Sequence, residues 1–175
     1  PKFSGLESDA VLVSPHLKIS ASYEWERDIR LFNAFHGLNN QIHVFVILFN
    51  ATSGLQAALS QREYWRGGNK NEFTICLGLD DAQNVKWCKA FSWCDLPQME
   101  TALESWYLEH THLDFKGLTN WLEANVSTLW KRKEFKDFKY LGKKLTPWKS
   151  ALVGFLTLAA CALFIYIAYY LSTTQ

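Results

Sequence analysis

The sequence has few of the residues that interrupt or cross-link a fold: four prolines and four cysteines in 175 residues, with no internal repeat and no low-complexity stretch. The absence of compositional bias argues against a disordered chain. Cys76, Cys88 and Cys94 precede residue 150, and an odd number of cysteines without a short-loop framework argues against a disulfide scaffold. We expect a folded protein from a reducing compartment.

Charge is absent from residues 150–171, which read SALVGFLTLAACALFIYIAYYL. As an α-helix rising about 1.5 Å per residue, this run would be about 33 Å long, close to the thickness of the hydrocarbon core of a bilayer. A buried helix of that length without a polar face would be unusual in so small a chain. We therefore expect a transmembrane helix over 150–171, followed by a short tail over 172–175.

A basic segment, residues 131–149, directly precedes this run and carries eight Lys or Arg residues against one Glu and one Asp. Such flanks stay on the cytoplasmic, matrix or stromal side of a membrane, so we expect the preceding domain on that side. We interpret the segment as a juxtamembrane linker that faces anionic lipid headgroups, and a solvated helix face is the alternative. The residues expected to contact lipid are Lys143, Lys144, Trp148, Lys149, Tyr169 and Tyr170.

The residues before the basic segment are numerous enough to bury one hydrophobic core. The chain is 49% hydrophobic and contains eight tryptophans. We expect a soluble α/β domain over 23–130, preceded by an N-terminal arm over 1–22. Helical spacing of apolar residues predicts helices over 23–35 (with Ser22 as N-cap and Gly37 as the stop), 51–64, from 96 onward, and from about 114 to 130. Runs of β-branched and aromatic residues predict strands over 11–13, 42–49, 73–79 and 85–93.

The order of these elements predicts a mixed sheet. The order strand, helix, strand over 42–79 predicts a right-handed crossover between two parallel strands. The loop 80–84 is typical of a hairpin and adds an antiparallel strand. The expected fold class is α/β: a small mixed-sheet sandwich with flanking helices, plus one C-terminal transmembrane helix.

Two polar clusters are candidate metal sites. His110 and His112 lie between carboxylates, and two imidazoles can bind a divalent cation if a loop lets both rings face one ion. On a regular helix the two side chains would point about 200° apart, so a polar interhelical turn is the simpler interpretation. Asp80 and Asp81 can hold a hard cation or act as an acid pair, with a solvated hairpin tip as the alternative.

Other sequence features argue against phosphate-loop and nucleic-acid binding and leave the role of the tryptophans open. The turn Gly-Gly-Asn-Lys-Asn over 67–71 lacks the spacing and the terminal Ser or Thr of a phosphate-binding loop. The basic charge is concentrated beside the uncharged run and the rest of the chain is acidic, so no nucleic-acid partner is expected. The tryptophans Trp65, Trp87, Trp93 and Trp106 mark either a docking surface or the core.

Residues 38–46 (LNNQIHVFV), the turn 67–71 and the hairpin 73–93 resemble the TPM domain family over about a third of the chain. That family has an α/β sandwich fold and is often tied to a membrane by one helix. Its members are associated with phosphatase activity, metal binding, or the assembly and upkeep of energy-converting membrane complexes. The acidic metal-binding positions of the family have no residue-by-residue match here, and many members are exported, whereas the charges of this chain favour the matrix or cytoplasmic side.

We expect a non-catalytic accessory subunit of a larger membrane complex, with integral membrane subunits as partners of its single span and with no cofactor. The chain begins at Pro1 rather than Met, so either a targeting segment has been removed or the N-terminus is missing. Together with the reduced cysteines, this favours an energy-transducing membrane such as the mitochondrial inner membrane. The alternatives are a membrane-anchored TPM-like phosphatase or metal-binding module, and a lipid-surface tethering module that uses the basic linker.

Overall fold

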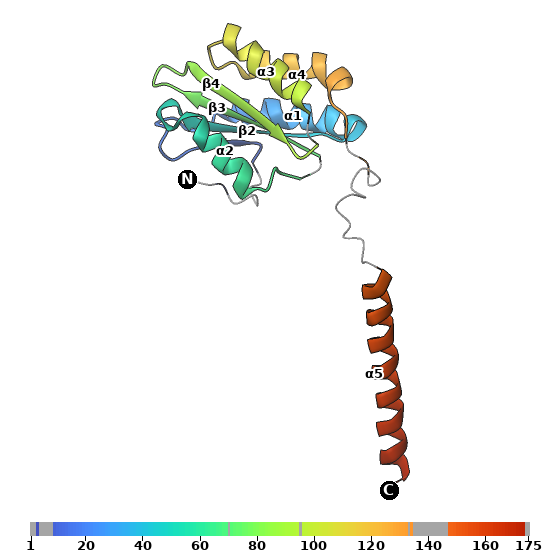
Figure 1. Cartoon of the computed structure of the whole chain (residues 1–175). Coiled ribbons are helices and arrows are strands. Elements are labelled where there is room, and N and C mark those ends of the chain that lie inside the picture. Colours follow the sequence, from blue (N-terminus) through green and yellow to red (C-terminus); the bar gives the residue numbers. More distant parts are fainter. Residues whose placement is uncertain are drawn as a thin grey trace. The chain divides into compact units, whose positions relative to one another are not determined.

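The structure, a computed structural model, describes Phe3 and residues 9–69, 71–94, 96–132, 134 and 147–173. Contacts divide the chain into two compact units, Pro1–Lys133 and Glu134–Gln175. The first unit contains a sheet with helices on both faces, and the second contains one long helix (Figure 1).

The sheet has four strands among the described residues, in the spatial order β1-β2-β3-β4. The strands are β1 (Val11–Val13), β2 (His43–Asn50), β3 (Glu72–Leu79) and β4 (Val85–Ser92). β1 pairs with β2 and β2 with β3 in parallel, whereas β3 and β4 are antiparallel, with an irregularity between Gly78 and Leu79. The predicted α/β fold with a mixed sheet is therefore confirmed, and each predicted strand agrees with the observed one to within one residue at either end.

The helices lie where the apolar spacing predicts them. The described residues form α1 (Tyr23–Asn40), a 3₁₀ turn η1 (Ala51–Ser53), α2 (Gly54–Tyr64), α3 (Pro97–Glu109), α4 (Phe115–Leu129) and α5 (Pro147–Thr173).

The two ends of α1 show where the sequence prediction holds and where it fails. The hydroxyl of Ser22 accepts a hydrogen bond from the backbone N–H of Glu24, as expected of an N-cap. The sequence predicts an end near Gly37, but the helix continues to Asn40. A β-carbon at Gly37 would lie 2.9 Å from the carbonyl oxygen of Ile42, so this glycine lets the returning chain approach the helix closely.

The helices cover opposite faces of the sheet. One core cluster joins α1, α3 and α4 to the sheet, and a second, smaller cluster places Ala58 of α2 against Ile47, Cys76 and Phe91 (Figure 1). β1, β2 and β3 follow one another across the sheet, and two right-handed crossovers advancing in one direction would put α1 and α2 on the same face. One of the two crossovers therefore has the left-handed sense, which is rare in parallel sheets.

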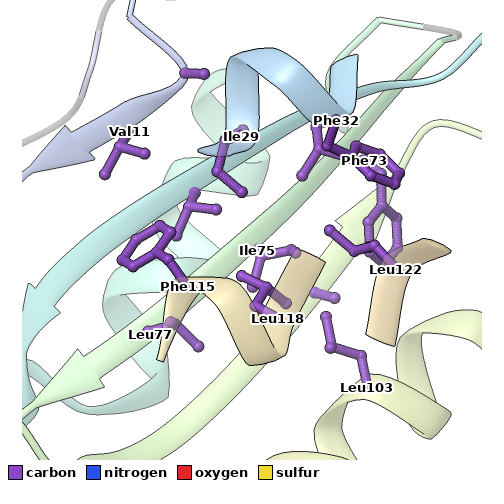
Figure 2. Packing of buried hydrophobic residues seen from close by; sticks show 14 of the residues in the cluster. Val11, Ile29, Phe32, Phe73, Ile75, Leu77, Leu103, Phe115, Leu118 and Leu122 are labelled. Carbon is purple, nitrogen blue, oxygen red and sulfur yellow. The ribbon is translucent and has the colours of Figure 1, made fainter. Parts of the chain in front are cut away.

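In the larger cluster, α4 packs against β3. Figure 2 shows Phe115, Leu118 and Leu122 facing the buried β3 side chains Ile75 and Leu77. Each fully buried Leu, Ile or Phe side chain contributes about 1.5–3 kcal/mol by leaving water, so this layer stabilises the first unit. Truncating Leu118 to alanine would cost about 2–5 kcal/mol.

Two polar side chains of α1 form hydrogen bonds with the backbone of the sheet, one at β2 and the other at the start of β1. Asn33 donates its Nδ2 to the carbonyl of Val44 at 3.0 Å and accepts the N–H of the same residue at 2.7 Å. The carboxylate of Glu26 accepts the N–H groups of Ala10 and Val11 at 2.9 and 2.8 Å. These contacts fix the position of α1 on the sheet, because an unpaired backbone group buried there would be costly.

The helix α5 covers the whole uncharged run in which the sequence predicts a membrane span. Its described side chains from Ala151 to Tyr166 are exposed. A search of the described residues finds no helix with both the length and the apolarity needed to cross a bilayer. Most of the predicted basic linker, including Lys143 and Lys144, lies outside the described residues.

Candidate functional site

Asp80 organises the turn between β3 and β4. Its Oδ1 accepts the backbone N–H groups of Ala82 and Asn84 at 3.0 and 2.8 Å. Its Oδ2 accepts Nδ2 of Asn84 at 3.1 Å and forms an ion pair with Nζ of Lys86 at 3.1 Å. The hydrogen bonds from Asn84, followed by the interaction with Lys86, lower the pKa of Asp80 to about 2. The carboxylate is therefore charged at neutral pH, and both of its oxygens are already bonded within the hairpin.

The fold brings the two predicted metal clusters next to each other. The turn between α3 and α4 runs along the tip of the hairpin, and Asn84 and His112 form an antiparallel β-bridge. The N–H of Val85 donates to the carbonyl of Thr111 at 2.6 Å, and the N–H of Leu113 donates to the carbonyl of Gln83 at 3.2 Å. This short pairing places the segment 111–113 at the outer edge of the sheet, in the position of a fifth strand.

The side chains of these clusters have separate roles where the structure shows them. His110 places its Nδ1 2.9 Å from the carbonyl oxygen of Trp106, and its ring stacks on that indole with centroids 4.3 Å apart. His112 and Asp81 are exposed. Within the described ranges, no group of three or more His, Cys, Asp or Glu side chains is arranged to hold a metal ion. The neighbouring backbones alone therefore do not assemble a closed ligand set, which for zinc needs about four ligands.

A groove of about 440 Å³ continues from this turn along the outer edge of β4. The edge of β4 forms one side and α3 the other, and the groove lies within the size range of ligand and peptide sites. It is lined by Leu55, Val85, Lys86, Trp87, Cys88, Thr101, Glu104, Ser105, Tyr107, Leu108 and Thr111.

Two groups in this groove, one buried and one half-buried, have raised pKa values. Tyr107 is 3% exposed, and its hydroxyl has no hydrogen-bond partner among the described residues. Burial raises the pKa of Tyr107 well above its usual value, and the nearby Cys88 and Asp114 raise it further. Burial likewise raises the pKa of the Cys88 thiol. Both groups are therefore neutral at physiological pH, and the Tyr107 hydroxyl is available to donate a hydrogen bond.

Glu104 closes one end of the groove. Its Oε1 accepts Nζ of Lys89 at 2.8 Å and the backbone N–H of Ala90 at 3.2 Å. A carboxylate oxygen of α3 thus occupies the place that a carbonyl of a neighbouring strand would take on the edge of β4.

The residues expected to contact lipid are only partly described. Trp148, at the start of α5, is 63% exposed, and Nζ of Lys149 lies 5.8 Å from the centroid of its ring. Tyr169 is also exposed. Lys143, Lys144 and the side chain of Tyr170 lie outside the described residues.

Sequence reasoning does not find the groove. Nothing in the positions of Tyr107 and Cys88 along the sequence shows that the two residues line one cavity. The four tryptophans divide between both interpretations: Trp65 and Trp87 pack against the smaller cluster, Trp106 packs against the larger one, and Trp93 is 37% exposed.

Comparison of the chain with models of protein families, with curated proteins and with solved structures found no match. The resemblance to the TPM domain family remains a prediction made from the residues.

Proposed function

We propose that the protein is an accessory subunit of an integral membrane complex, anchored by α5 and without catalytic activity of its own. The observation that carries this proposal is the exposure of apolar side chains all around α5. Phe155, Leu158 and Phe164 are 68%, 72% and 75% exposed in the isolated chain. A helix that is apolar on every side is unstable in water and requires a bilayer or other protein surfaces.

The length of the helix also fits a membrane anchor. At about 1.5 Å per residue, the 27 residues of α5 extend about 40 Å, which exceeds a hydrocarbon core of about 30 Å. The side chains that the structure describes without a break, residues 151–166, are fewer than the roughly 20 that a span needs. The sequence extends the same uncharged run through residues 150 and 167–171.

The domain offers a second surface that supports membership of a complex. Leu31, Phe35 and Leu38 follow one another at helical spacing on α1, and all three are exposed, Phe35 by 72% and Leu38 by 85%. Such a stripe of large apolar side chains is typical of an interaction surface when it is contiguous. Partner subunits could contact this stripe in addition to α5.

The location is part of the same proposal. The basic segment before α5 favours a domain on the matrix or cytoplasmic side, where anionic headgroups attract lysine and arginine. Cys76 is a buried free thiol, which supports a reducing compartment. An energy-transducing membrane such as the mitochondrial inner membrane meets both conditions.

Alkaline carbonate extraction of membranes tests the anchor. The ten Leu, Ile, Phe and Val residues of the run together favour insertion by about 3–6 kcal/mol, and two central lysines oppose it by about 5–7 kcal/mol. We expect the natural chain to stay in the membrane pellet and the double variant Leu158→Lys, Leu163→Lys to appear in the supernatant. The control Ser172→Lys, Thr173→Lys adds the same charge beyond the run and should stay in the pellet. Release of the natural chain would contradict the proposal.

The approach of the hairpin tip to the turn between α3 and α4 favours a second candidate, a membrane-anchored TPM-like phosphatase or metal-binding module. The two carboxylates Asp80 and Asp81 and the histidine His112 supply ligand types that divalent cations accept. The test is turnover of p-nitrophenyl phosphate by full-length protein with Mg²⁺ or Mn²⁺. Turnover that is lost in Asp81→Asn would support this candidate. No turnover, or turnover that Asp81→Asn leaves unchanged, would exclude it.

A further inference from the structure

Among the described residues, the outer edge of β4 has its backbone bonded near both ends, at Val85 and at Ala90 and Ser92. The N–H of Val85 is bonded to the carbonyl of Thr111, and the N–H of Ala90 is bonded to Glu104. In an antiparallel ladder every second residue turns its N–H and C=O away from the partner strand. Because Ala90 turns outward, Cys88 does so as well, and its backbone faces the groove.

The groove therefore occupies the position of a missing strand. The segment 111–113 begins this strand at one end, and the carboxylate of Glu104 replaces it at the other. The five intervals from Val85 to Ala90 span about 17 Å at about 3.3 Å per residue, enough for an extended segment of about four residues. The backbone C=O and N–H groups of an extended peptide can form hydrogen bonds with the outward N–H and C=O groups of Cys88.

The unpartnered hydroxyl of Tyr107 is an independent sign that this groove accepts a ligand. A buried hydroxyl without a hydrogen bond costs about 1–3 kcal/mol, and native structures contain few such groups. Tyr107 lines the groove beside α3 and is not bonded to any described residue. The hydroxyl is covered in the free structure, and an acceptor oxygen of a bound segment would satisfy it once a side chain of the groove wall moves aside.

The charges at the groove indicate which segment fits. Lys86 is paired with Asp80, and Glu104 is paired with Lys89. The groove therefore has no unbalanced charge of either sign among its described residues. Its remaining lining is largely apolar and includes Leu55 and Leu108.

We propose that this groove binds an uncharged, extended polypeptide segment of a partner protein, which adds to the sheet as a fifth strand beside β4. The segment pairs its backbone with Cys88 and accepts a hydrogen bond from the hydroxyl of Tyr107. This proposal concerns the first unit alone and does not depend on the location of α5.

The test uses full-length protein in mild detergent and an array of capped heptapeptides in which Val, Ile, Leu or Phe alternates with Thr or Asn. Fluorescence anisotropy measures binding, and amide hydrogen exchange locates it. We expect at least one peptide to bind with a Kd below about 1 mM and to slow exchange at Cys88. Absence of binding by every peptide at that concentration would overturn the proposal.

The variant Tyr107→Phe separates binding from folding. We expect it to weaken peptide binding about fivefold to tenfold, because the hydrogen bond in the complex is lost. We also expect it to raise the melting temperature of the free protein, because a buried unpaired hydroxyl is removed. The control Tyr23→Phe alters an exposed hydroxyl on α1 and should change neither quantity. Equal binding by natural protein and Tyr107→Phe would overturn the proposed contact.

A second variant covers the case in which Tyr107→Phe fails to fold. Leu108 is 81% exposed at the rim of the groove, so Leu108→Asp should keep the fold and still weaken peptide binding. Unchanged binding in this variant would count against the groove. If Cys88 is protected without peptide and the protein dimerises with rising concentration, the occupant is a second copy of the chain and the proposal of a separate partner is wrong.

Discussion

Substitution of Gly78 by alanine should destabilise the first unit by displacing Trp87. Gly78 lies opposite Trp87 in the β3–β4 pair. A β-carbon at Gly78 would lie 2.1 Å from Nε1 and from Cε2 of the indole, well inside the 3.0 Å below which an atom must move. The indole would have to leave its place, and its hydrogen bond of 3.1 Å to the carbonyl of Ala51 and its stacking on Phe49 would be lost.

The size of the effect follows from these contacts. Adding a methyl group to a packed site costs about 1–3 kcal/mol, and loss of one hydrogen bond adds about 1 kcal/mol. Replacing glycine in a strand returns about 0.5–1 kcal/mol through the lower entropy of the unfolded chain. The net loss is about 1–3.5 kcal/mol, which corresponds to a fall of roughly 3–17 °C in the melting temperature of a unit of this size.

Thermal unfolding of full-length protein in mild detergent, followed by near-ultraviolet circular dichroism, measures this loss. Gly154→Ala is the matched control, because a β-carbon at Gly154 meets no atom within 4 Å. We expect the control to melt with the natural protein. A melting temperature of Gly78→Ala within about 2 °C of the natural protein would refute the packing of Trp87 on Gly78.

Three further changes test other contacts of the first unit. Asn33→Leu should lower the free energy of unfolding by about 2–4 kcal/mol in urea denaturation, because two hydrogen bonds to the backbone of β2 are lost. The control Asn39→Ala changes an exposed residue and should alter the free energy of unfolding by no more than about 0.5 kcal/mol. A small effect of Asn33→Leu would contradict those bonds. The pKa of Asp80 is lowered to about 2, so its stabilisation is complete above its usual pKa of about 4 and is lost as the pH falls toward 2. The protection factor of the Asn84 amide, which corrects for the intrinsic pH dependence of exchange, should therefore fall across that interval. A pH-independent protection factor would argue against the role of the carboxylate. Trp130→Phe removes an indole hydrogen bond of 2.8 Å to the carbonyl of Asn40 at the end of α1. It should lower the free energy of unfolding by about 1–3 kcal/mol in the same assay, and an unchanged denaturation midpoint would contradict this contact.

The parts of the fold that depend on local sequence could be predicted. The strands consist of dense β-branched and aromatic runs, and Ser22 caps α1 through a contact only two residues away. The end of α1 could not be predicted, because Gly37 does not end the helix but makes room for the backbone at Ile42. A glycine gives the same local signal whether it ends a helix or makes room for another segment.

The handedness of the crossovers and the arrangement of the candidate site depend on contacts between distant residues. The general preference for right-handed crossovers gives no warning that one of the two here is left-handed. Nothing near Asp80 in the sequence indicates that its hairpin lies beside His112, because a backbone bridge joins Asn84 to a residue 28 positions later. The groove with Tyr107 arises from the same long-range pairing, so pattern and spacing alone do not locate it.

The central claim is that the chain is a subunit of a membrane complex held by α5. Native gel migration after extraction in mild detergent, with mass spectrometry of the band, tests it most directly. We expect the tagged full-length protein to co-migrate with a larger assembly of integral membrane proteins in fixed stoichiometry. Migration of the protein alone, from membranes that retain it, would contradict the claim and would favour the metal-binding or lipid-tethering alternatives.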